Sequence, residues 1–476
     1  MSDEKWPELL AQAWQAVSGE STPPAGFSLT GPSPAGLLPS PLPVADVAVA
    51  CVGAALLAAA GPGGRRTVSL NAEHLAAAVR SEGYLRVGGE PLGPGFAPLS
   101  RFWAAADGWV RTHANYPWHR DALLAAFDLR PDPAASNSAA TAESEVTADS
   151  QVADAVARAI AATPAAEVEQ RVGQAGGIAT MMRTPEQWLA HPHGQVVATQ
   201  PLVSATRLES GSPRPRNPGP LPASGIRVLD LTRVIAGPVC TRFLGALGAD
   251  VLRLDPPHRP ELAIHRYDGL PGKRSALLDA ATPAGAQRLH ELLDGADVLV
   301  HGYRPGALSR FGLDGPDLAR RHPGLVVVRL SAWGSDGPWG DRRGFDSIVQ
   351  VASGVAVRSS PDGRRPGALP CQLLDHGTGY LCAAAALVAL REQSAHGGTQ
   401  FRELSLARTA HWLLSSPTPP APTQQPGHPT ATPWLATVNS DAGPVTTVSP
   451  PGTLNGTALH WPPLPIAYAA SPPQWQ

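Results

Sequence analysis

The chain has 476 residues, of which 43% are hydrophobic and 16% charged, and its formal net charge is −2. This length predicts two or more domains, and the hydrophobic content is sufficient for buried cores. The near-neutral charge argues against a nucleic-acid partner and against a polybasic membrane-binding segment.

The four cysteines do not have the CxxC spacing of metal and redox sites, and each lies among apolar residues. They are therefore expected to be buried free thiols in a reducing compartment. The first residues, MSDEKWPELLAQAWQAV, are acidic and lack the basic start of a signal peptide. We therefore expect a cytoplasmic location. The four cysteines to which the expectation of buried thiols applies are Cys51, Cys240, Cys371 and Cys382.

The most apolar run of the chain is Val44–Ala60, which contains Asp46. It is shorter than the ~20 residues that a membrane span needs, so we expect a buried helix and no membrane partner. Residues 41–79 also resemble residues 368–414: each reads strand, aspartate, Ala-rich helix, Gly-Gly turn, strand ending in Ser-Leu, helix. Asp46 stands near the place of Asp375. A partial duplication is one explanation, and chance similarity of two Ala-rich helices is the other.

Composition divides the chain into five parts. Residues 223–414 alternate short Val/Leu-rich runs with helical segments, and the runs are continuous, as in buried parallel strands. This pattern predicts a doubly wound, Rossmann-like α/β sheet. No GxGxxG follows the first strand, where the turn reads TRVIAGPV, so a dinucleotide site is not expected. The other parts are a degenerate first copy (1–86), a small α+β domain (87–207), a Pro-rich linker (208–222) and a Pro-rich tail (415–476).

Asp375 lies where an apolar, strand-like run ends and a long Ala/Leu helix begins, in LPCQLLDHGTGYLCAAAALVAL. From the residues alone there are two interpretations. The carboxylate either caps the helix N-terminus or is a reactive group at the carboxyl end of a strand, where α/β sheets bind their ligands.

Five segments in order favour the second interpretation. They are GIRVLDLTRVIAGPVCTRFLGALGADVLRLD, PGKRSALLD, ADVLVHGYRPGALSRFGLD, SAWGSDGPWGDRRGFDSIVQVASG and LLDHGTGYLCAAAALVALRE. Together, over 226–406, they resemble the class III CoA-transferases, the family of formyl-CoA:oxalate and carnitine CoA-transferases. Residues 87–197 more weakly resemble the small domain of that family, in a permuted order.

The resemblance implies that Asp375 is a nucleophile that attacks an acyl-CoA thioester. A mixed anhydride and an aspartyl-CoA thioester would then carry CoA to an acceptor acid. No metal or tightly bound cofactor is implied, because the CoA thioester is itself the substrate. Gly88 and Gly89, in RVGGEP, stand at the place of the family's glycine loop over the nucleophile. Gly377 and Gly379 are further candidates, as glycines whose N–H groups are open to a developing oxyanion.

The resemblance also implies that cationic side chains bind the CoA phosphates. The matching positions are Lys273, Arg274 and Arg310, and Arg304 lies in the same loop. Family members form interlocked dimers, so a homodimer is possible here.

Some positions depart from the family's pattern. Ile235 and Pro256 stand where relatives carry polar or basic residues, and together with the permuted order they leave an inactive acyl-CoA-binding homologue as the alternative. An acyl-CoA racemase or intramolecular CoA-transferase is less favoured. Phe345 replaces the histidine that racemases use as a base. The lone histidines His301 and His113 are expected to be structural.

Overall fold

The computed structural model describes residues 4–61, 66–93, 95–129, 142–208, 211–216, 219–417 and 430–476. The chain forms two compact units. The first unit contains Met1–Gly93, Val196–Arg342 and Pro370–Gln476, and the second contains Pro94–Gln195 and Arg343–Leu369. The second unit therefore takes a segment, 343–369, from within the range that the sequence assigns to the large domain.

The first unit contains a seven-stranded, mostly parallel sheet. Six strands are parallel, and β8 (Ser204–Leu208) pairs antiparallel to β14 (Thr399–Ser405) at one edge. If the six parallel strands are numbered in chain order, their order across the sheet is 3-2-1-4-5-6. The strand order therefore reverses between β9 and β12, because the later strands are added on the other side of β9. The order is β11 (Arg274–Leu277), β10 (Asp250–Asp255), β9 (Arg227–Leu231), β12 (Val298–His301), β13 (Val326–Ser331), β14 (Thr399–Ser405) and β8 (Ser204–Leu208).

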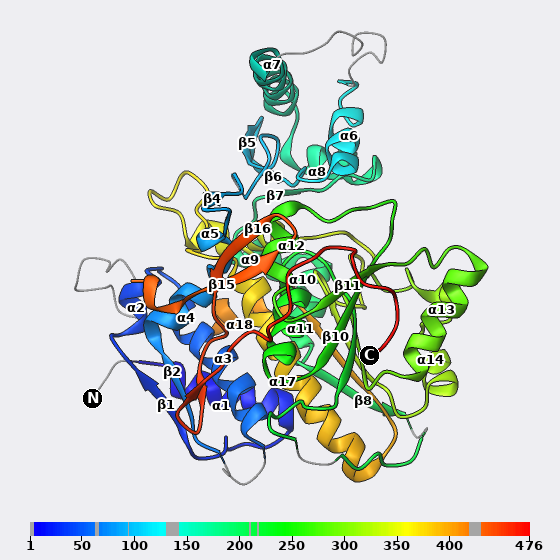
Figure 1. The fold of residues 1–476 in the computed structure, drawn as a ribbon. Coiled ribbons are helices and arrows are strands. Elements are labelled where there is room, and N and C mark those ends of the chain that lie inside the picture. Colours follow the sequence, from blue (N-terminus) through cyan, green and yellow to red (C-terminus); the bar gives the residue numbers. More distant parts are fainter. Residues whose placement is uncertain are drawn as a thin grey trace. The chain divides into compact units, whose positions relative to one another are not determined.

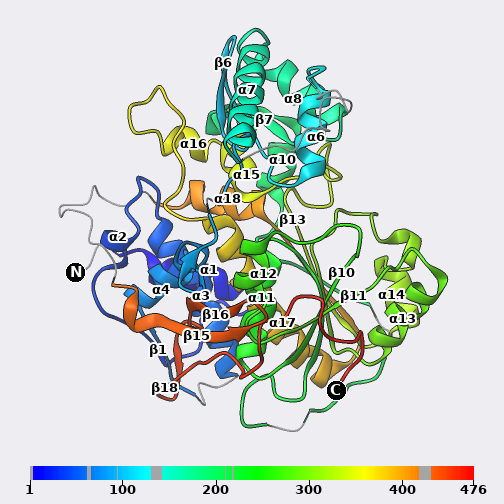
Figure 2. The same ribbon diagram turned by 45° about the horizontal axis from the view of Figure 1, so that its top comes forward.

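Helices pack on both faces of this sheet (Figure 2). Leu229 and Leu299 belong to a buried cluster with Leu289 of α13, whereas the neighbouring Val228 and Val300 point to the opposite face. Because both faces are covered, the strands are continuously apolar, as the sequence predicts. The helices of this region are α11 (Ala236–Ala246), α12 (Ala263–Gly269), α13 (Pro283–Asp294), α14 (Gly315–Arg321), α17 (Leu373–His396), α18 (Leu406–Ser415) and the 3-10 helix η3 (Ser309–Phe311).

The long helix α17 packs along α11 on one side and along α3 (Val44–Ala60) on the other (Figure 1). Every residue of α3 is buried, which confirms the buried helix expected there. Among the described residues, α17 alone is long and apolar enough to cross a membrane, and that apolar stretch is wholly buried inside the protein. The four cysteines are buried and free, as predicted.

The N-terminal region and the tail share two small sheets. In one, β1 (Phe27–Thr30) runs parallel to β2 (Val68–Asn71), and β17 (Thr453–Leu454) adds antiparallel to β2, followed by β18 (Thr457–Ala458). In the other, β16 (Gly443–Val448) pairs with β3 (Arg86–Val87). The remaining elements are β4 (Glu90–Pro91), β15 (Leu435–Ser440), α1 (Trp6–Ser18), α2 (Pro34–Leu37), α4 (Ala72–Ala78), α5 (Ser81–Tyr84) and the 3-10 helix η4 (Thr432–Trp434).

The second unit is built on a three-stranded antiparallel sheet. A buried Glu169–Arg183 ion pair, 2.8 Å long, ties a helix of this unit to the segment after its last strand. The ring of Phe345 stacks on that of His113, with 3.7 Å between centroids. The elements are β5 (Phe102–Ala105), β6 (Gly108–Thr112), β7 (Ala179–Met181), α6 (Pro117–Ala125), α7 (Ala142–Ala161), α8 (Ala165–Gln174), α9 (Pro185–Ala190), α15 (Asp346–Ser353) and α16 (Val355–Arg358); α10 (Pro192–Thr199) follows α9.

Candidate active site

Asp375 is the third residue of α17, and 6% of it is exposed. The helix begins at Leu373, and residues 367–372, all of them described, form no strand, so the predicted strand-like run before Asp375 is wrong. The N-cap residue Gln372 makes no side-chain capping bond to the described start of the helix. The first N–H groups of a helix have no partner one turn back, and together with the helix dipole they favour a carboxylate in the first turn.

The connection between strands places this end of α17 toward the carboxyl edge of the sheet. β13 and β14 run parallel, and α17 lies between them in sequence and packs on both. A helix that joins parallel strands returns the chain from their carboxyl ends to their amino ends. Asp375, at the helix start, therefore lies toward the carboxyl ends of the strands, where open α/β sheets bind ligands.

Two glycines after Asp375 serve helix packing. A Cβ on Gly379 would lie 2.5 Å from the carbonyl oxygen of Ala236 in α11, and one on Gly377 would lie 3.3 Å from Sγ of Cys51 in α3. Both residues are within the regular helix, so their N–H groups point to carbonyls of the preceding turn. The expectation that these N–H groups are open to an oxyanion is therefore wrong, and the glycines instead allow α17 to approach its neighbours closely.

A segment from the N-terminal region contacts the start of α17. The Nε2 atom of His376 lies 3.0 Å from Oε2 of Glu82 in α5. Burial alone would raise the pKa of Glu82, but His376, a backbone hydrogen bond and Arg242 together hold that pKa below its ordinary value. The adjacent Ser81 hydrogen-bonds Asp268, which forms a buried 3.0 Å ion pair with Arg242 of α11. The sequence resemblance does not reveal this contact because its partners are nearly 300 residues apart.

Gly88 and Gly89 form the turn of the β3–β4 hairpin. Their φ angles are +60° and +90°, and a β-carbon on either would meet no atom of the described residues within 4 Å. Left-handed conformations at both central residues are typical of the tight hairpin turns that favour glycine. Gly88 follows Glu82 by six residues, so the turn lies within ~20 Å of the contact between Glu82 and His376. A role over the nucleophile stays a prediction.

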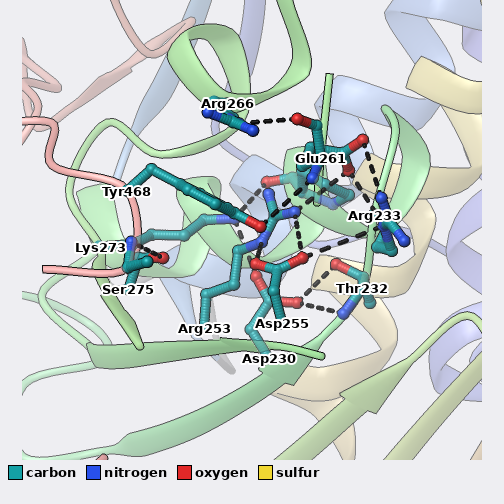
Figure 3. Close-up of polar contacts among 12 residues, drawn as sticks. Asp230, Thr232, Arg233, Arg253, Asp255, Glu261, Arg266, Lys273, Ser275 and Tyr468 are labelled. Atoms are coloured by element: carbon teal, nitrogen blue, oxygen red, sulfur yellow. Dashed lines mark hydrogen bonds and ion pairs between the residues drawn. The ribbon is translucent and has the colours of Figure 1, made fainter. Parts of the chain in front are cut away.

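Lys273 lies in a buried polar cluster, and its ammonium group is fully engaged there. Its Nζ donates to Oδ2 of Asp230 at 2.9 Å, to Oγ1 of Thr241 and to the carbonyl oxygen of Pro238. Burial lowers the pKa of Lys273 to about 8. At Asp230 burial raises the pKa, but the charges of Lys273 and Arg253 and the hydrogen bonds from two threonines together hold it below its ordinary value. Figure 3 shows Lys273 reaching into this cluster. Arg274 is also engaged, by both carboxylate oxygens of Asp250.

The same cluster fixes the loop after β9, which sequence reasoning missed. Oε2 of Glu261 accepts from the backbone N–H of Val234 at 3.0 Å. It also accepts from Arg253 at 3.1 Å (Figure 3). Val234 has φ +69°, a left-handed conformation that is costly for a β-branched residue. Arg253 also forms a 2.7 Å ion pair with Asp255. These buried charges hold the strained loop that leads into α11.

Arg304 and Arg310 lie in the loop after β12, with different surroundings. Arg304 donates to the carbonyl oxygen of Asp341 at 2.7 Å and lines a cavity of about 200 Å³ at the carboxyl ends of β12, β13 and β14. The guanidinium of Arg310 lies over the ring of Phe311, 4.6 Å from its centroid, and Arg310 does not line that cavity. Binding of CoA phosphates by Lys273, Arg274, Arg304 or Arg310 stays a prediction.

Among the described residues, there is no group of three or more His, Cys, Asp or Glu side chains that could hold a metal ion.

The sequence model of the family "CoA-transferase family III" matches residues 14–212 and 223–433, which is most of the chain. The chain belongs to CoA-transferase family III.

This family III chain is similar to several curated proteins. It is 35% identical over 190 residues to a "Probable fatty acyl-CoA transferase Rv3272" of Mycobacterium tuberculosis, covering 37% of this chain and 48% of that protein. It is 32% identical over 213 residues to a "Succinyl-CoA--D-citramalate CoA-transferase" of Chloroflexus aurantiacus, covering 42% and 53%. The chain thus spans about half the length of the curated relatives it matches. A crystal structure of the Mycobacterium tuberculosis protein aligns with a TM-score of 0.39 and 33% identity, covering 42% of this chain and 58% of that one.

Proposed function

We propose that this family III chain transfers CoA from an acyl-CoA to a carboxylic acid, with Asp375 as the nucleophile. The observation that carries the proposal is the position of Asp375, in the first turn of α17 at the carboxyl edge of the parallel sheet. The order of the six parallel strands is that of a doubly wound fold, whose ligands bind at this edge.

The chemistry needs an ionised carboxylate. An oxygen of Asp375 attacks the thioester carbonyl carbon, the C–S bond breaks, and CoA leaves as a thiolate. The thiolate then attacks the aspartyl carbonyl of the mixed anhydride and releases the donor acid as a carboxylate. The acceptor carboxylate attacks the carbonyl carbon of the resulting aspartyl thioester, the C–S bond breaks, and CoA leaves again as a thiolate from a second mixed anhydride. The thiolate then attacks the acceptor's carbonyl carbon and the bond to the Asp375 oxygen breaks, which gives the new acyl-CoA and regenerates the Asp375 carboxylate. The covalent intermediates divide one difficult exchange into several easier steps.

We further propose that the chain is a partial duplication with one working nucleophile. α3, β2 and α4 follow one another as α17, β14 and α18 do, and Asp46 and Asp375 are each the third residue of their helix. Asp46 accepts hydrogen bonds from the backbone N–H groups of Lys5 (3.1 Å) and Trp6 (2.9 Å), at the start of α1. Its carboxylate is thereby used as a helix cap, which supports a structural role for Asp46.

The two aspartates provide a matched pair for the test. Wild type, Asp375→Asn and Asp46→Asn are incubated with a panel of acyl-CoAs, and intact-protein mass spectra are recorded with and without hydroxylamine. We expect a CoA or acyl adduct on wild type and on Asp46→Asn, because the amide oxygen introduced by that substitution would still accept from both N–H groups. Asp375→Asn should form none.

CoA binding is measured on the same proteins by calorimetry. An adduct that persists in Asp375→Asn would contradict the assignment of the nucleophile. Binding of CoA without any adduct on the wild type would favour the inactive acyl-CoA-binding homologue.

A further inference from the structure

The cavity of about 200 Å³ lies where β12, β13 and β14 end and α18 begins. His301 is the last residue of β12, Ser331 the last of β13 and Ser405 the last of β14, and all three line it together with Arg408 of α18. All its lining residues belong to the first unit.

Most charged groups of the cavity already have partners. Arg329 is paired with Glu403, and Asp336 accepts a hydrogen bond from Gln200. Asp314 accepts from Ser309 at 2.8 Å. Arg329 and Glu403 neutralise each other, whereas Asp314 and Asp336 keep their negative charges, which Arg304 and Arg408 balance on the cavity wall.

Two groups on the cavity wall lack such partners within the described part of the chain. Both ring nitrogens of His301, which is 5% exposed, are buried without a hydrogen bond to any described residue, and so are Nε and Nη1 of Arg408. Burying a polar group without a hydrogen bond is unfavourable, and more so when the group is charged, because the water it loses is not replaced. A guanidinium edge offers two N–H donors in a fork that matches a carboxylate.

We propose that this cavity binds a carboxylate of a short organic acid, with Arg408 and His301 as its recognition groups. The inference rests on the proposed function and adds to it the class of acid substrate. Arg408 supplies charge and a bidentate contact. Burial lowers the pKa of His301 to about 3, so its ring is neutral at physiological pH and donates one N–H.

The size of the cavity favours a small acid over CoA. Pockets that bury drug-sized ligands measure about 300–1,000 Å³, which is more than this cavity offers. Asp375 does not line the cavity, but α18, which carries Arg408, contacts the first turns of α17: Oγ1 of Thr409 lies 2.7 Å from Oγ1 of Thr378, one turn after Asp375. An acid held by Arg408 would therefore lie on the α18 side of the α17 N-terminus.

The test measures binding without turnover. Radiolabelled acetate, succinate and glutarate, and inorganic phosphate as a separate probe, are equilibrated with wild type, Arg408→Gln, Arg408→Lys and His301→Phe. Arg320→Gln is the matched control, because it removes the same charge from a side chain that is 70% exposed. We expect at least one acid to bind the wild type and Arg320→Gln equally. Its affinity should fall tenfold or more in Arg408→Gln, with partial recovery in Arg408→Lys.

CoA affinity is measured in parallel, and thermal melting verifies that each variant is folded. If Arg408→Gln loses affinity for CoA and phosphate but not for the acid, the cavity binds a CoA phosphate and the proposal is wrong. It is equally wrong if the wild type binds none of the acids. Binding is also measured on Asp375→Asn, so that a failure of the nucleophile assignment remains separate from a failure of this one.

Discussion

At the scale of single residues, Lys273 shows that a positively charged motif does not by itself distinguish a phosphate ligand from a buried structural cation. Its ammonium group is buried and donates to Asp230, Thr241 and a backbone carbonyl. A cation needed inside the protein and a cation needed for CoA look identical in sequence. The difference depends on where Asp230 lies, and that is set by the pairing of strands far apart in the chain.

Lys273→Met tests this structural role. It leaves the Asp230 carboxylate buried without its main partner, and breaking a buried ion pair in this way costs about 3–5 kcal/mol. We expect the free energy of unfolding, measured with urea, to fall by that amount. The double variant Lys273→Met, Asp230→Asn should regain part of it. Unchanged stability combined with weaker CoA binding would instead support a role for Lys273 in binding CoA.

The sequence could not identify His301 and Arg408 as a binding pair, because their signal also depends on the folded structure. His301 was expected to be structural, and Arg408 belongs to a helix that carries no motif. Their interest comes from buried nitrogen atoms without partners among the described residues on one cavity wall. Such a pattern depends on three-dimensional packing, whereas Asp375 could be proposed from the sequence because its surroundings there are distinctive.

At the scale of elements, the sequence predicted the helices and strands of the large sheet well. Buried parallel strands are continuous Val/Leu runs, and β9, β10, β12 and β13 all have this composition. The prediction of a strand before Asp375 is wrong because the apolar residues Leu373 and Leu374 form the first turn of a helix. A short apolar run does not by itself distinguish a strand from a buried helix.

The contact of α17 with α11 depends on Gly379. Gly379→Ala would place a methyl group 2.5 Å from the Ala236 carbonyl oxygen, so the helices must separate. Overpacking of this kind costs about 1–3 kcal/mol. We expect a matching loss of stability, together with slower adduct formation at Asp375, one turn away. Gly83→Ala, whose new methyl group meets no described atom within 4 Å, should alter neither quantity. Normal adduct rates in Gly379→Ala would show that the helix contact does not position Asp375.

At the scale of the whole molecule, the sequence predicted a large α/β part and a smaller part, but not how distant segments combine. Residues 343–369 join the second unit, and the tail joins the N-terminal sheets. Neither association has a local signal, because strand pairing between residues hundreds of positions apart depends on the completed fold. The described part of the Pro-rich tail is tied to β2 and β3 by strand pairing.

His74 connects the same regions and predicts a pH dependence of stability. Its ring stacks on Trp434 and contacts the carbonyl oxygen of Ser449, and burial lowers its pKa from 6.5 to about 4. Between these two values the unfolded chain binds a proton that the folded protein does not. The free energy of unfolding should therefore fall, as pH decreases from about 6.5 to 4, by about 1.4 kcal/mol per pH unit from this residue.

Urea unfolding at several pH values in this range measures the slope. His74→Phe keeps an aromatic ring against Trp434 and should reduce the slope by that amount, with a residual slope from other buried histidines such as His301. His258→Phe is the control, because the His258 side chain is 80% exposed. An identical slope in His74→Phe and wild type would contradict the prediction.

The strand pairing of β2 also has a consequence for synthesis on the ribosome. β2 pairs with β1 on one edge and with β17, almost 400 residues later, on the other. During translation, the first edge can be paired early, while the second remains open until residues 453–454 have emerged. An open strand edge is a template for pairing with other chains. The edge of β2 is therefore exposed to such pairing until then, and stalled translation before residue 453 should favour aggregation.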